Sequence, residues 1–86
     1  MADDDMFHVE HRDGTEVQPE WWVRSHAVLP AVGVSPEGVP EPFVHVRLED
    51  GSGVHSFVMT ADDADMLALH VMDCAALART NAALAT

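Results

Sequence analysis

The sequence predicts an α+β fold, in which a small antiparallel sheet packs on one long C-terminal helix. Alternating apolar residues flank an Asp-Gly pair in two segments, 7–17 and 44–54, and an Ala- and Leu-rich segment follows Thr60. The chain has 86 residues, and one hydrophobic core normally serves about 100 to 200. We therefore expect residues 6–86 to form a single domain, preceded by an acidic flexible leader at residues 1–5.

Both segments with alternating residues are predicted to be β-hairpins. Gly14 and Gly51 supply the positive φ that a tight turn requires, each after an aspartate. The two segments match at a spacing of 37, as in His8 and His45. This similarity has two explanations, a duplication or the same turn rules acting twice.

An extra strand is predicted at residues 21–29, where Trp22, Arg24 and His26 alternate with other side chains. Pro19 would also suit the first turn of a helix, so both readings stay open, with the strand favoured. Residues 30–42 are expected to form a long loop, because they are rich in residues that interrupt helices and strands. These residues are Pro30, Gly33, Pro36, Gly38, Pro40 and Pro42.

The C-terminal helix is predicted to run from Ala61 to about Ala83. The Thr60 hydroxyl is placed to cap it, with Asp63 three residues on, and Arg79 suits the negative end of the helix dipole. One face carries mostly small apolar residues and is expected to lie closely on the sheet. The residues of this face are Ala64, Leu67, Ala68, Val71, Ala75, Ala78 and Ala82.

The opposite helix face is the predicted interaction site. It carries three large apolar residues where a lone domain normally has polar groups. The candidate residues are Met66, Leu69 and Leu77, the neighbouring Asp65 and Asp73, and an outward-facing Trp22. Scattered apolar residues are also normal on protein surfaces, so this face is a homodimer interface, a target-binding patch or an ordinary surface.

No catalytic, metal or cofactor site is predicted. Cys74 is expected to be buried in the helix, where a thiol is inert. Three pairs of side chains are candidate metal ligands, but the first pair points to opposite faces of a strand, the second depends on the hairpin register, and the third has no third ligand. They are His8 with His11, His45 with His55, and His70 with Cys74. The Gly51-Ser52-Gly53 segment lies in a hairpin turn and does not lead into a helix, so it lacks the amides of a phosphate-binding loop. We therefore expect a protein that is not an enzyme.

The charge excludes several classes of partner. Fifteen acidic residues against four arginines give a net charge of −11, which opposes direct binding to nucleic acids and to anionic membranes.

No apolar run reaches the roughly 18 residues of a membrane span, and the N-terminus lacks the features of a signal peptide. A cytoplasmic location is expected. The absence of Lys, Ile and Tyr indicates a GC-rich genome.

The segment from Val44 to Ala78, with Phe57-Val58-Met59-Thr60 leading into an Ala-rich helix, resembles small uncharacterised proteins of actinobacteria and their phages. The resemblance implies no activity. The leading hypothesis is a small acidic interaction module that binds and modulates a partner protein, with a phage genome as one candidate source. It is expected to form a homo-oligomer, with a dimer favoured. The alternatives are an acidic nucleic-acid mimic that inhibits a DNA-binding protein and a structural subunit of a homo-oligomer.

Overall fold

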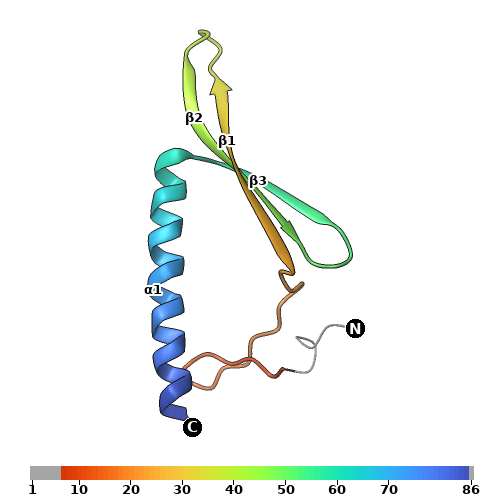
Figure 1. Cartoon of the computed structure of the whole chain (residues 1–86), viewed down its shortest axis with the longest axis vertical. Helices are drawn as coiled ribbons and strands as arrows, with labels where there is room; N and C mark the ends of the chain where they lie inside the picture. Colours follow the sequence, from red (N-terminus) through yellow and green to blue (C-terminus); the bar gives the residue numbers. More distant parts are fainter. Residues whose placement is uncertain (1–6, 86) are drawn as a thin grey trace.

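The computed structural model describes residues 7–85 and confirms the α+β fold (Figure 1). Three strands, β1 (Ser25–Val34), β2 (Pro40–Glu49) and β3 (Val54–Thr60), are followed by one helix, α1 (Ala61–Ala85). The strands form one antiparallel sheet in the order β1-β2-β3. Helix α1 contacts β2 and β3. The predicted leader at residues 1–5 lies outside the described residues.

The first hairpin joins β1 to β2, and it shows that the loop predicted at residues 30–42 is wrong. The two strands pair from Ser25 opposite Glu49 to Val34 opposite Pro40. A short turn closes them, in which the amides of Ser35 and Gly38 donate to the carbonyl oxygens of Val39 and Ser35. The strand predicted at residues 21–29 therefore exists, but it is shifted and runs over Ser25–Val34.

The prolines of these strands lie where the sheet tolerates them. Pro30 is in β1, which is an edge strand of the described sheet. Pro40 and Pro42 are in the part of β2 that β3 does not reach, because β3 pairs only with Phe43–Glu49. Proline has no amide hydrogen to donate, and on the edge of a sheet this loss destabilises the strand little. The prolines therefore indicated a loop where the chain forms parts of two strands and a short turn.

The second hairpin, predicted at residues 44–54, is confirmed, although its strands extend further. β2 and β3 pair from Phe43 opposite Thr60 to Glu49 opposite Val54. Gly51 in the connecting turn has φ of 90°, in the left-handed region that favours glycine. The Asp50 amide donates to the Gly53 carbonyl oxygen at 3.3 Å and closes the turn.

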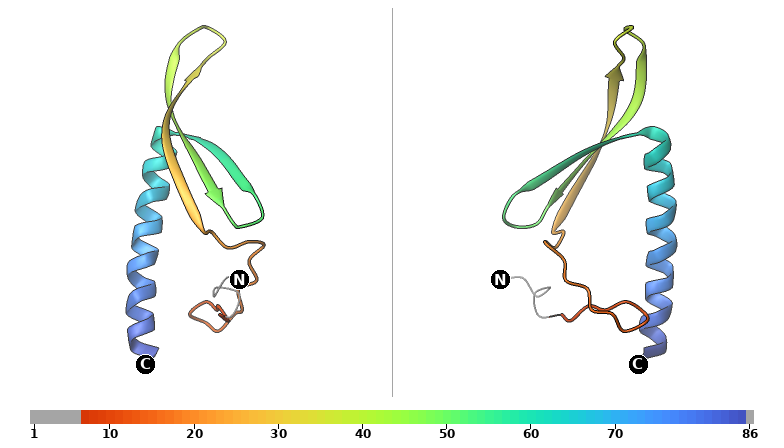
Figure 2. Two further views of the ribbon diagram at one scale, coloured as in Figure 1. Left: turned by 45° about the vertical axis from the view of Figure 1, so that its right-hand side comes forward. Right: turned by 180° about the vertical axis from the view of Figure 1, so that it is seen from behind.

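The prediction of a two-stranded hairpin at residues 7–17 is wrong. Only one isolated bridge, between Glu10 and Glu16, joins its two arms, although Gly14 has the expected positive φ of 90°. A two-stranded hairpin is marginal without a third strand or a packed face. This segment lies away from the three-stranded sheet and has neither, so it forms a turn rather than strands (Figure 2).

Helix α1 confirms the prediction for the C-terminal segment. The Asp63 amide donates to the Thr60 hydroxyl oxygen at 3.1 Å, as expected of an N-cap. The helix meets the sheet at its N-terminal end and separates from it toward its C-terminus (Figure 2). The close packing expected for its small-residue face is therefore not seen: Leu67 is 48% and Val71 57% exposed, and no residue of the described range 7–85 is buried.

Candidate interaction surface

An open apolar groove of about 400 Å³ lies between one face of the sheet and the N-terminal half of α1. We call it the sheet–helix groove. The sheet contributes one wall and α1 the other. Its lining residues are His26, Val28, Val44, Val46, Leu48, Met59, Ala64, Leu67, Ala68, Val71 and Met72. None of these eleven residues is an aspartate, glutamate, lysine or arginine, although the whole chain carries a net charge of −11.

Strand register explains the apolar wall of the sheet. Val46 lies opposite Val28 on one side and Phe57 on the other, so the three side chains share a face. Val44 lies opposite Met59 on the same face. Side chains alternate along a strand, so Arg47 and Glu49 in β2 point to the other face. The face that lines the groove is thus apolar, whereas the charged side chains of β2 lie on the opposite face together with apolar residues such as Phe43 and Val58.

The helix wall consists of four residues of the predicted core face together with Met72. Ala64, Leu67, Ala68 and Val71 lie toward the sheet, as their helical spacing predicted. The alanines further along the helix have no sheet opposite them. The groove is consequently closed at the start of α1 and open toward its end.

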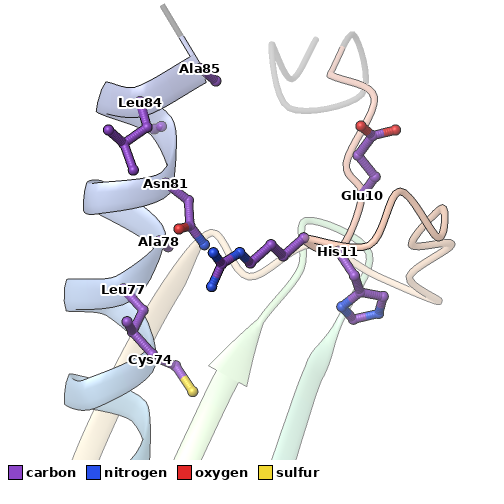
Figure 3. Close-up of a pocket in the computed structure, with 10 residues that line it drawn as sticks. Glu10, His11, Cys74, Leu77, Ala78, Asn81, Leu84 and Ala85 are labelled. Carbon is purple, nitrogen blue, oxygen red and sulfur yellow. The ribbon is translucent and has the colours of Figure 1, made fainter.

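A second hollow, of about 730 Å³, lies between the C-terminal half of α1 and the loop at residues 10–12. Cys74, Leu77 and Asn81 line its helix side, across from Glu10 and His11 (Figure 3). Cys74 is exposed, so the prediction that it is buried was wrong. Burial required the helix to lie on the sheet along its whole length, and α1 leaves the sheet before Cys74.

The predicted interaction residues lie outside the sheet–helix groove. Met66, Leu69 and Leu77 are 55%, 58% and 61% exposed, and Leu77 lines the second hollow. Asp65 and Asp73 are exposed on the same helix, whereas Trp22 is half-buried in the segment that precedes β1. Their role in binding stays a prediction. The groove itself was missed in the sequence because it depends on the register of three strands.

A small polar cluster holds the β2–β3 turn. The Asp50 carboxylate accepts hydrogen bonds from the Ser52 amide at 2.8 Å, the Ser52 hydroxyl at 2.8 Å and the Gly53 amide at 3.0 Å. Its other oxygen lies 3.0 Å from His55 Nε2. The bond with His55 and then those from Ser52 hold the pKa of Asp50 well below its ordinary value of 3.8, against the opposing effect of burial.

A similar but smaller arrangement lies in the turn at residues 11–15. The Thr15 amide donates to the Asp13 carboxylate at 2.9 Å, and hydrogen bonding to Thr15 lowers the pKa of Asp13. His8 Nε2 lies 3.0 Å from a carboxylate oxygen of Glu10. These contacts are exposed and local. They stabilise a turn and form no enclosed site.

The histidines do not gather into a ligand set. His45 lies opposite Val58 and His55 opposite Leu48, which places the two imidazoles on different faces of the sheet. Within residues 7–85, no group of three or more His, Cys, Asp or Glu side chains is arranged to hold a metal ion.

Over the same part of the chain, no helix is both long enough and apolar enough to cross a membrane. No protein-family model matches this chain, and comparisons with curated proteins and with solved structures also returned no match.

Proposed function

We propose that the chain is a small acidic protein–protein interaction module, which binds and modulates a partner polypeptide through the sheet–helix groove. The observation that carries the proposal is the combination of an apolar, uncharged groove with the absence of any buried residue in the described range. A folded domain stabilises itself by removing apolar surface from water. Here much of that surface stays open, and the sheet–helix groove gathers one part of it.

The distribution of charge supports an apolar contact. The lining of the groove contains no carboxylate, lysine or arginine, whereas acidic residues are plentiful elsewhere in the chain. Protein interfaces are depleted of charge at their centre and carry polar groups at the rim. A complex formed in this way depends little on salt, because its stability comes from apolar burial rather than from exposed charge pairs.

The test is a pull-down with the tagged chain from a lysate of the organism that encodes it, washed in low and then high salt. Two variants are compared with the wild type. Leu67→Glu puts a charge into the groove, and Leu69→Glu is its control, since it makes the same change at 58% exposure outside the groove. Mass spectrometry identifies the retained polypeptide, which includes any untagged copy of the chain.

The proposal expects a polypeptide that the wild type and Leu69→Glu retain in high salt and that Leu67→Glu loses. Loss from Leu69→Glu alone would move the interface to the outer helix face that the sequence predicts. Equal retention by all three proteins, or retention only in low salt, would contradict binding through the groove.

A further inference from the structure

We infer that the polypeptide in the sheet–helix groove is a second copy of this chain, so that two copies pack groove to groove about a twofold axis. The inference rests on the proposed function, because it names the occupant of the same groove. Three features of the structure support it: the excess of exposed surface, the absence of carboxylates and basic residues in the groove, and a proline in one of the two edge strands of the sheet.

The first feature is the exposed area. The chain exposes 7135 Å², whereas a folded monomer of 9.3 kDa is expected to expose about 5,000 Å². Seven residues lie outside the described range, and an extended chain of that length exposes about 1,100 Å². Subtracting that amount in full still leaves an excess of about 1,000 Å² per chain.

This excess, which is spread over the whole chain, is as large as the area that a stable dimer covers on each partner. Standard interfaces bury about 800 Å² on each partner, and obligate homodimers bury about 1,000 to 2,500 Å² on each. Obligate interfaces are also the more apolar ones and resemble a domain core divided in two. The groove has this character, since Val28, Val46 and Met59 on the sheet face Leu67 and Val71 on the helix across open space.

The second feature is charge. Each copy carries a net charge of −11, so two copies repel one another wherever their acidic surfaces approach. A contact between copies therefore requires a patch without carboxylates, and the sheet–helix groove is such a patch. A basic partner would instead be matched by carboxylates in the lining. The groove provides none of these, which favours a surface as neutral as itself.

The third feature concerns how the copies meet. Of the two edge strands, β1 has Pro30 in its middle, and this proline has no amide hydrogen to donate to a strand that pairs edge to edge. Packing through faces has no such obstacle. Ala64 and Ala68 are small enough to let a second helix approach α1 closely, and a twofold axis presents the same residues from both copies.

The experiment is the molar mass of the untagged chain by light scattering over a wide range of concentration. The wild type and the control Leu69→Glu are expected to have twice the 9.3 kDa of one chain, and Leu67→Glu the mass of one chain. The milder Leu67→Ala introduces no charge and is expected to raise the dimer dissociation constant on the order of 100-fold, since the twofold axis removes the side chain twice.

A second measurement keeps the test decisive if Leu67→Glu does not fold. In a sample that mixes isotope-labelled and unlabelled wild-type chains, filtered NMR spectra are expected to show contacts between the Leu67 methyl groups of one chain and Val46 or Met59 of the other. A wild-type mass of one chain, a mass above two chains, or a dimer that Leu69→Glu disrupts and Leu67→Glu does not would each overturn the inference.

The outcomes also separate this inference from the proposed function. A wild-type chain that is monomeric, yet retains a foreign polypeptide in a Leu67-dependent manner, would refute the second copy and support the module. A monomer with no Leu67-dependent partner of any kind would refute both.

Discussion

The indole ring of Trp21 stacks on the imidazole of His55, with ring centroids 4.2 Å apart and an interplanar angle of 7°. Trp21 precedes β1, and His55 lies at the start of β3, so the stack joins two segments that are far apart in the sequence. The same imidazole bonds to Asp50. One histidine therefore ties the segment before the sheet to the β2–β3 turn.

Trp21→Ala is expected to destabilise the fold by about 0.5–1.5 kcal/mol in addition to the loss of buried area, since stacked aromatic pairs contribute this much. The His55 ring protons should also shift downfield in the NMR spectrum, because they lose the ring current of the indole. Trp22→Ala is the control, since it removes the neighbouring half-buried indole and leaves the stack. An unchanged His55 spectrum in Trp21→Ala would show that the rings do not stack in solution.

Acid is expected to weaken the β2–β3 turn through Asp50. The pKa of this carboxyl is lower in the folded chain than its ordinary value of 3.8. Its contribution to stability is therefore fully present above about pH 4 to 5 and is lost as the pH falls below 3.8 toward the folded pKa. Melting temperatures from pH 6 down to pH 2 measure this loss.

Asp50→Asn should flatten that pH dependence and lower the melting temperature at pH 6, because the amide replaces one acceptor oxygen with a donor. Asp73→Asn removes one exposed negative charge elsewhere and controls for the change in net charge. If both variants gave the same melting curve at every pH, the hydrogen bonds of Asp50 would have no part in acid sensitivity.

The Thr60 cap predicts a stability change of known size. Thr60→Ala removes the hydroxyl that accepts from the Asp63 amide, and the loss of such a cap typically costs about 1 kcal/mol. Thr60→Ser retains the hydroxyl and is expected to stay within a few tenths of a kcal/mol of the wild type. Urea unfolding followed by helical circular dichroism compares them, and equal midpoints for alanine and serine would exclude a capping role.

Gly33 is expected to accept a side chain only if the ring of Phe43 moves. A Cβ at this position in β1 would overlap the ring of Phe43 on the neighbouring strand. Gly33→Ala should therefore destabilise the sheet by about 1–3 kcal/mol, the usual cost of overpacking. Gly53→Ala is the control, because nothing lies within 4 Å of a Cβ there. The double variant Gly33→Ala/Phe43→Leu should recover part of the loss in thermal unfolding.

Features with a local cause could be predicted from the sequence. Thr60 caps the helix through a residue three positions away, and Asp50 and Gly51 form a turn from adjacent residues. Prediction failed where the outcome depends on the rest of the sheet. Pro40 and Pro42 suggested a loop, but they fit in β2 because β3 ends its pairing at Phe43. Residues 7–17 repeat the pattern of a hairpin without a sheet to complete it.

The groove could not be predicted for a related reason. A slip of one residue between β2 and β3 would turn His55 and Phe57 to the other face. The observed register, with Val46 opposite Phe57, places Phe57 on the apolar face. Helical spacing correctly grouped Ala64, Leu67, Ala68 and Val71, but it could not show that α1 separates from the sheet. That separation depends on how the whole chain packs and not on the helix alone.

Strand β3 ends at Thr60 and helix α1 begins at Ala61, so no linker separates them. The helix has 25 residues and is thus about 37 Å long at a rise of 1.5 Å per residue. A rotation of about 10° at this junction displaces the far end of the helix by about 6 Å at that length. A small change in the backbone angles of Thr60 would therefore move the far end of α1 and change the width of the sheet–helix groove.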